Sequence, residues 1–409
     1  MRATRRLAIR SFDWTLLGST LLLVAFGILV LYSASRTSAG EASYHVRQLA
    51  WAAIGIGFLA LGVFLAQRWL DVLDFLAIPA YALSLVLLAV LLLRPSTGVE
   101  RWLAVGPFRF QPSEIAKISL VIVMARVLSN RPPEKVGLRH FLVPALVAGV
   151  PFLLVLRQPD LGTALVFGAI LIPMLFWAGL PERVLLLVLS PAVGLIASSH
   201  LPAWIVFLFL LLLVLLVTHS SLPFSAVTLG VNMLVGIAGP ILWNQLKDYQ
   251  KTRIVTFLDP GHDPLGAGYQ IIQSEVAIGS GGLAGKGFLQ EGTQKWLSFL
   301  PEQHTDFVFS VVGEEFGFIG CVLLLVVYAV LLGRVLLVAS RARDRFASLL
   351  VVGFFGYLSF QVVVNVGMTL GLVPVTGLPL PFLSYGGSSL TTTLVAIGIV
   401  LGVGLRRRC

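Results

Sequence analysis

Residues 300–337 read LPEQHTDFVFSVVGEEFGFIGCVLLLVVYAVLLGRVLL, and they decide the fold. The first seven of these residues contain two carboxylates and an imidazole, and the chain from Phe307 onward is almost entirely apolar. An apolar run of about 18 residues or more predicts a helix that spans a membrane, because hydrocarbon offers backbone polar groups no partner outside the helix. Chemistry is therefore expected at a membrane face, where the polar stretch meets the span.

The composition of the whole chain also indicates a bilayer protein. Of the 409 residues, 57% are hydrophobic and 12% are charged, and the mean hydropathy is +0.94. So little polar surface cannot cover a soluble globule of this size. The formal net charge of +10 comes from Arg and Lys in short loops and at the ends, so topology explains it and no nucleic-acid partner is expected. Cys321 and Cys409 provide neither a disulfide framework nor a CxxC metal site.

Hydropathy predicts an all-α polytopic bundle of 10–12 transmembrane helices in a single membrane domain, residues 1–409. The segment 244–306 is a large polar loop. The segment 374–389 is too broken for a transmembrane helix and too apolar for a solvated loop, which predicts a re-entrant segment. The predicted spans are 13–33, 48–66, 71–93, 113–129, 141–156, 162–179, 183–200, 202–219, 225–243, 307–337, 347–373 and 390–405.

The distribution of basic residues predicts the orientation of these spans. With both termini in the cytoplasm, the loops 94–112, 157–161, 244–306 and 374–389 lie outside, and they contain most of the Pro, Gly and acidic clusters. The same orientation places inside the basic residues Arg131, Lys135, Arg139, Arg334, Arg341, Arg343, Arg345 and Arg406–Arg408. The positive-inside rule is satisfied, and the active face is expected to be external.

Asp306 is the candidate catalytic residue. It directly precedes the apolar run, and a carboxylate partly removed from water beside lipid is suited to act as a general base. Glu302 and His304 are candidate substrate-binding neighbours. Two other interpretations stay open: Asp306 is a helix N-cap, or it binds a metal with His304. Glu314 and Glu315, about two turns into the span, favour a functional carboxylate cluster.

A second candidate site opens the span at 113–129. Pro112 suits a helix start, and Glu114 and Lys117 are three residues apart, so they share one helix face and can pair. The pair is either a structural ion pair or one wall of the active cavity. Arg109, just before it, is a candidate substrate-binding residue.

Further candidates lie in the predicted external loops. Asp160 is placed to cap the helix that follows, and Arg157 is a partner for an anionic ligand. Lys286 lies among glycines whose backbone can approach a phosphate closely, although the pattern is no Walker A motif and glycine-rich loops are mostly turns. Arg253 in the long loop and Ser384 in the re-entrant segment complete the candidate substrate-binding residues.

Three motifs carry a resemblance to a known family. Residues 263–274 (DPLGAGYQIIQS), 292–294 (GTQ) and 299–307 (FLPEQHTDF) resemble the SEDS family, the shape, elongation, division and sporulation proteins. They are more similar to its elongation member RodA than to its division member FtsW. The resemblance covers nearly the whole chain, with the motifs in the family's order.

The resemblance implies a lipid II glycosyltransferase of the bacterial cytoplasmic (inner) membrane that builds peptidoglycan for cell elongation and rod shape. Its implied substrate is the disaccharide-pentapeptide on undecaprenyl diphosphate, and its implied partners are a class B penicillin-binding protein, a transpeptidase, and the elongation machinery. Asp306 matches the family's essential external aspartate, and Glu114 and Lys117 match paired charges in its fourth span. Arg109, Lys117 or Arg253 would offset negative charge on the diphosphate. The cofactor that would assist them is a divalent cation, Mg²⁺ or Mn²⁺.

The chain departs from the family's usual ten spans between residues 180 and 244, where an extra apolar hairpin is expected within 183–243. Two rival functions remain open. A flippase or transporter for lipid II would use Glu114, Lys117 and Glu315 as intramembrane charge relays. A non-catalytic scaffold would leave the dense motifs of the polar loop without a purpose.

Overall fold

The structure is a computed structural model that describes residues 12–35, 44–93, 101–105, 108–130, 138–218, 222–245, 251–252, 255–257, 259, 263, 268–290 and 302–406. The regular secondary structure of the described chain is helical apart from one antiparallel hairpin of β1 (Leu103–Val105) and β2 (Phe108–Phe110). Its helices are α2 (Trp14–Ser35), α3 (Tyr44–Arg68), α4 (Leu70–Leu93), α5 (Pro112–Ser129), α6 (Leu138–Arg157), α7 (Leu161–Trp177), α8 (Glu182–Ala197), α9 (Leu201–Val217), α10 (Leu222–Gln245), α12 (Tyr269–Gly281), α13 (Val308–Ser340), α14 (Arg345–Thr369) and α15 (Gly387–Leu405).

The helices fall where hydropathy predicted spans. In the described part of the chain, seven helices are long and apolar enough to cross a membrane. Three shorter apolar helices, Leu142–Arg157, Leu161–Trp177 and Leu201–Val217, coincide with predicted spans as well. The polytopic all-α class is therefore confirmed, and the total of 10–12 spans stays a prediction.

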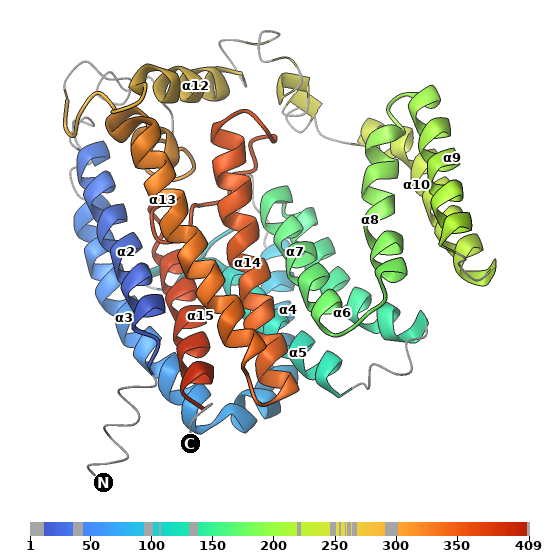
Figure 1. The fold of residues 1–409 in the computed structure, drawn as a ribbon, viewed down its shortest axis with the longest axis horizontal. Helices are drawn as coiled ribbons and strands as arrows, with labels where there is room; N and C mark the ends of the chain where they lie inside the picture. Colours follow the sequence, from blue (N-terminus) through green and yellow to red (C-terminus); the bar gives the residue numbers. More distant parts are fainter. Residues whose placement is uncertain are drawn as a thin grey trace.

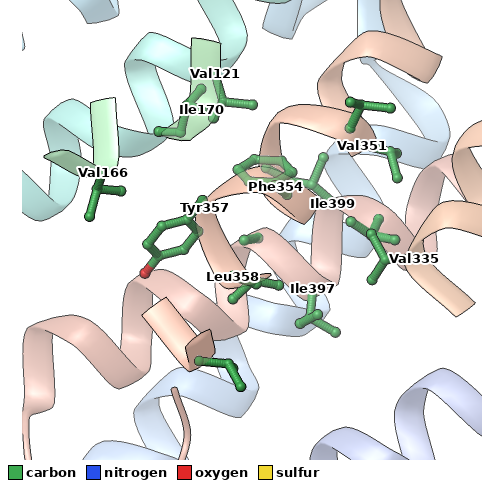
Figure 2. Close-up of a cluster of buried hydrophobic side chains, with 14 of the residues drawn as sticks. Val121, Val166, Ile170, Val335, Val351, Phe354, Tyr357, Leu358, Ile397 and Ile399 are labelled. Carbon is green, nitrogen blue, oxygen red and sulfur yellow. The ribbon is translucent and has the colours of Figure 1, made fainter. Parts of the chain in front are cut away.

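Helix α14 lies at the centre of the main bundle, in contact with α5, α7, α13 and α15 (Figure 1). Its Phe354 and Tyr357 lie in a buried cluster with Val121 of α5 and Ile399 of α15 (Figure 2). Close helix contacts in membranes depend on small residues, and Gly353 admits the Val121 side chain against α14. Branched side chains thus fill the bundle's centre.

Helices α8, α9 and α10 form a separate group beside the main bundle (Figure 1). They pack mainly on one another, and α8 reaches the bundle through α7. Inside the group, the Asn232 side chain of α10 donates a hydrogen bond of 2.8 Å to Ser190 Oγ of α8. These helices occupy residues 183–243, where the extra hairpin is expected.

The re-entrant segment is irregular, as predicted. After α14 the chain continues without a helix to residue 386, yet Leu378, Leu380 and Leu383 are buried. A Cβ on Gly27, inside α2, would overlap the carbonyl oxygen of Phe382. Non-helical backbone of this kind is tolerated in a membrane protein only where protein or a cavity surrounds it.

The contact between α3 and α15 gives a stability prediction. A Cβ on Gly398 of α15 would overlap the backbone carbonyl of Leu59, so Gly398→Ala should destabilise the protein by about 1–3 kcal/mol through overpacking. Gly333→Ala is the matched control, because nothing lies within 4 Å of that Cβ position and alanine favours helix. Thermal unfolding in detergent should show a lower Tm for the first variant only; equal Tm values would contradict the packing.

Candidate active site

Asp306 lies in a tight turn directly before α13. The Glu302 carbonyl oxygen accepts hydrogen bonds from the N–H groups of residues 305, 306 and 307, at 3.1–3.2 Å. Glu302 itself has φ 51°, in the left-handed region that non-glycine residues rarely adopt. The N-cap of α13 is Phe307, whose own side chain makes no capping hydrogen bond. The turn therefore places Asp306, half-buried, directly before the N-cap.

Side chains of α14 and of the re-entrant segment hold this turn by hydrogen bonds to its backbone carbonyls. Asn365 of α14 donates to the Asp306 carbonyl at 2.9 Å and to the Leu378 carbonyl at 2.7 Å. Ser384 Oγ donates to the Thr305 carbonyl at 2.5 Å. Gly377 has φ 71°, and a Cβ there would lie 3.4 Å from Asp306 Oδ2. The carboxylate of Asp306 thus lies against the re-entrant segment, and Ser384 acts on the backbone of the turn.

Aromatic rings flank the turn on the side of α3. The rings of His304 and Tyr44 stack with centroids 4.3 Å apart, and Tyr385 meets Tyr44 edge-on at 4.8 Å. Gln48, one turn along α3, is buried and donates to the Ser384 carbonyl at 3.1 Å. His304 and Ser384 were predicted site residues, whereas Tyr44, Gln48 and Tyr385 were not.

Glu302 lies at the exposed edge of the turn. Its side chain is 57% exposed, and His304 Nε2 is 4.0 Å from its carboxylate. Thr305 Oγ1 donates to the same carboxylate at 2.9 Å. Glu302 and His304 are thus brought beside Asp306, as the sequence predicted.

Glu114 and Lys117 form a buried ion pair. Their side chains are 5% and 1% exposed, and Lys117 Nζ is 2.7 Å from Glu114 Oε1. The ammonium also lies 4.9 Å from the centre of the Tyr357 ring on α14. Tyr357 and Asn365 are eight residues apart on α14, or ~12 Å along the helix. One helix therefore touches both the Asp306 turn and the ion pair.

The other charged residues predicted for the site lie elsewhere. Asp160 caps α7 by accepting from the Thr163 N–H at 3.1 Å, so the capping interpretation is confirmed. Arg101, which sequence reasoning missed, lies 3.5 Å from Asp160. Arg157 ends α6 and is exposed. Arg109 lies in β2 opposite Ala104, and Arg253 falls outside the described residues.

The glycines around Lys286 pack against α13. This helix breaks at Gly317, where φ is 64°, and the loop after α12 pairs with the broken backbone. The N–H groups of Lys286 and Gly287 donate to the Glu314 and Glu315 carbonyls, at 2.9 and 3.1 Å. Lys286 Nζ lies 2.8 Å from the Glu314 carboxylate. These two amides bind α13, which favours the turn interpretation of the glycine-rich loop, and substrate binding by Lys286 stays a prediction.

The carboxylates within α13 belong to the same junction. Glu315 accepts from Ser33 Oγ of α2 and from the Leu289 N–H. Glu314 and Glu315 thus join α2, the loop and α13. Among the described residues, no group of three or more His, Cys, Asp or Glu could hold a metal ion.

Comparison with known proteins identifies the family. The chain matches the family FTSW_RODA_SPOVE, described as "Cell cycle protein", over residues 13–203 and 184–408. The two matched pieces meet in the region where the extra hairpin is expected. Peptidoglycan glycosyltransferase MrdB of Escherichia coli (strain K12) is 37% identical over 399 residues, covering 97% of this chain and 94% of that protein.

Relatives named RodA and relatives named FtsW match this chain at similar identity. Peptidoglycan glycosyltransferase RodA of Treponema pallidum is 34% identical and covers 98% of this chain and 99% of that protein. A probable peptidoglycan glycosyltransferase FtsW of Trichlorobacter lovleyi is 37% identical, covering 98% and 95%.

A solved structure shares the fold. It is described as "Structural coordination of polymerization and crosslinking by a peptidoglycan synthase complex", and it is 35% identical with a TM-score of 0.69. The match covers 97% of this chain and 98% of that one. Sequence and fold thus agree over nearly the whole length, and the chain belongs to the FtsW/RodA/SpoVE family, the SEDS proteins.

Proposed function

We propose that this protein is a peptidoglycan glycosyltransferase that polymerises lipid II during cell elongation. One observation carries the proposal: a half-buried carboxylate, Asp306, is fixed by backbone hydrogen bonds against the re-entrant segment. The names of the MrdB and RodA relatives support the activity. The substrate is the disaccharide-pentapeptide linked to undecaprenyl diphosphate.

Asp306 acts as the general base in this mechanism. It accepts the proton of the acceptor sugar's 4-hydroxyl as that oxygen attacks the anomeric carbon of the donor. A new carbon–oxygen bond forms, and the bond to the diphosphate breaks with its electron pair leaving on undecaprenyl diphosphate. One carboxylate suffices because diphosphate is a good leaving group, unlike the sugar oxygen that glycosidases must protonate.

The polymerase activity also fits the placement of polar groups better than transport does. Buried charges of the described chain include Glu114, Lys117 and Glu314, near the end of the bundle that carries the Asp306 turn. Beyond Tyr357 the centre is a cluster of branched and aromatic side chains (Figure 2). A flippase relay would need polar groups along the whole path, so the apolar cluster favours the enzyme.

The bundle's two ends support an external site in the bacterial cytoplasmic membrane. Asp13 before α2 pairs with Arg334 at 2.7 Å, and the loop after α13 contains Arg341 and Arg343. The Asp306 turn lies at the other end of α13, near α12 (Figure 1). Under the positive-inside rule the basic end, with both termini, is cytoplasmic and Asp306 is extracytoplasmic.

Partners and cofactor follow from the same proposal. The related synthase complex couples polymerisation with crosslinking, which supports a class B penicillin-binding protein as transpeptidase partner. Mg²⁺ or Mn²⁺ stays a prediction, and no step is assigned to it, because Mg²⁺ is usually held by one or two carboxylates together with the substrate's own phosphates.

Asp306→Asn tests the general base. The purified protein with its transpeptidase partner and lipid II should lose polymerisation by roughly 10²–10⁴-fold, while its Tm stays unchanged because backbone bonds hold the turn. Asp344→Asn, at the basic end, is the matched control and should polymerise normally. Normal glycan synthesis by Asp306→Asn would refute the assignment.

The ion pair gives a second test. Lys117→Met should lower stability by about 3–5 kcal/mol, because it leaves the Glu114 carboxylate buried and unpaired. The double variant Glu114→Lys/Lys117→Glu should recover most of the Tm. Its polymerisation should stay at least about ten-fold below wild type, since misplaced groups slow the chemistry. Full activity of the swapped protein would instead indicate a purely structural pair.

A further inference from the structure

The side-chain amide of Gln361 on α14 is buried and makes no hydrogen bond in the described part of the chain. It is 0% exposed, and neither Nε2 nor Oε1 has a hydrogen-bond partner among the described residues. Buried polar groups are nearly always paired, so a fully unpaired amide calls for an explanation. Nothing in the reaction scheme or the Asp306 clamp uses this side chain.

The packing of α5 on α14 shows which residues lie near Gln361. Gly353 of α14 contacts Val121 of α5. Four residues later on α14, Tyr357 contacts Lys117, which lies four residues before Val121 on α5. The helices are therefore antiparallel in this contact. One further step of four residues brings Gln361 level with residue 113, at the start of α5.

Other unpaired groups gather at the same level. In the described part of the chain, Ser113 Oγ and Glu114 Oε2 on α5 are buried without a hydrogen-bond partner, and so is Oδ1 of Asn365, one turn beyond Gln361. Asn365 in turn donates to the carbonyl of Asp306. Donors and acceptors without partners thus occur on α5 and α14 at the level between the ion pair and the Asp306 turn.

The charges of Glu114 and Lys117 indicate that a ligand group bound beside Gln361 would be uncharged. Lys117 is neutralised by Glu114 at 2.7 Å, so the pair adds no net charge. The free Glu114 oxygen repels a diphosphate, and the Lys117 ammonium repels a metal cation. What remains is an amide that donates and accepts, an amide oxygen, a hydroxyl and a carboxylate oxygen. A secondary amide matches Gln361 through two hydrogen bonds, since each amide has one N–H and one C=O to offer.

We propose that Gln361 binds the acetamido group of a lipid II sugar when α5 and α14 part at their outer ends. This inference rests on the proposed function, because it places the amide of that substrate beside Asp306. Binding would give the Gln361 amide the partners that it lacks in the closed bundle. Gln361 is thus a binding residue with no part in proton transfer.

Gln361→Met separates binding from stability. Methionine has a similar shape and no amide, so removing the unpaired group should leave Tm unchanged or raise it. In glycan synthesis, KM for lipid II should rise about ten- to a hundred-fold, as expected for two lost hydrogen bonds, with kcat changed far less. A raised Tm with an unchanged KM would show that the amide has no binding role, and overturn the inference.

Controls identify the ligand group. Asn232→Leu, which removes a buried amide in α10 with one unpaired atom, should leave KM unchanged. Lipid II without its pentapeptide should show the same KM defect with Gln361→Met; a defect seen only with the peptide would assign the amide to the peptide and overturn the sugar contact.

The failure of the proposed function would be distinguishable. If the wild type made no glycan, that function would fall, and lipid II-induced thermal stabilisation would still decide the role of Gln361. A lipid II-induced rise in Tm that the wild type shows and Gln361→Met lacks would support the binding role of Gln361. Equal rises in Tm, or none in either protein, would overturn it.

Discussion

Backbone polar groups inside a bilayer must find partners within the protein, and this constraint governs the candidate active site. Two non-helical pieces, the turn before α13 and the re-entrant segment after α14, meet near the membrane face. Asn365 bonds to a carbonyl in each of them, and Ser384 ties the second to the first. Side chains of α14 and of the re-entrant segment thus supply the partners that hydrocarbon cannot, and Asp306 is positioned as a consequence.

The same constraint explains the break in α13. A helix interrupted at Gly317 frees backbone groups, and the loop after α12 bonds to them: Phe318 and Ile319 donate to the carbonyls of Gly282 and Leu283. Gly285 and Gly281 are needed because a Cβ at either would overlap the α13 backbone. The glycines are thus packing residues, and α12 is fixed across the end of α13 (Figure 1).

Hydropathy predicted the helices because burial in lipid requires long apolar runs, and the polar residues beside Asp306 were found because they interrupt such a run. Residues inside apolar runs were missed. Asn365 and Gln361 lie within α14 among valines and glycines, and only the folded structure shows that Asn365 binds the Asp306 turn and that Gln361 lies level with the start of α5. Tyr44 and Tyr385 were missed because their ring contacts with His304, stacked for Tyr44 and edge-on for Tyr385, join residues about 260 and 80 positions apart, a separation that carries no local signal. The sequence left the role of the loop around Lys286 open because a glycine-rich loop has the same composition whether it meets phosphate or a helix.

Helices α8–α10 show why this chain can carry additional apolar sequence without disturbing its site. The residues that hold Asp306 come from α3, α14 and the segment before α15. The α8–α10 group meets the bundle mainly through α7, and its own polar contact, Asn232 with Ser190, is satisfied within the group. The hairpin predicted within 183–243 would cross the membrane twice and return the chain to the same side, so the loop that leads to Asp306 would keep its face. Long insertions are tolerated where few contacts depend on them, and in the described part of the chain Asn365, Ser384 and Gln48, which hold the site, lie outside these helices.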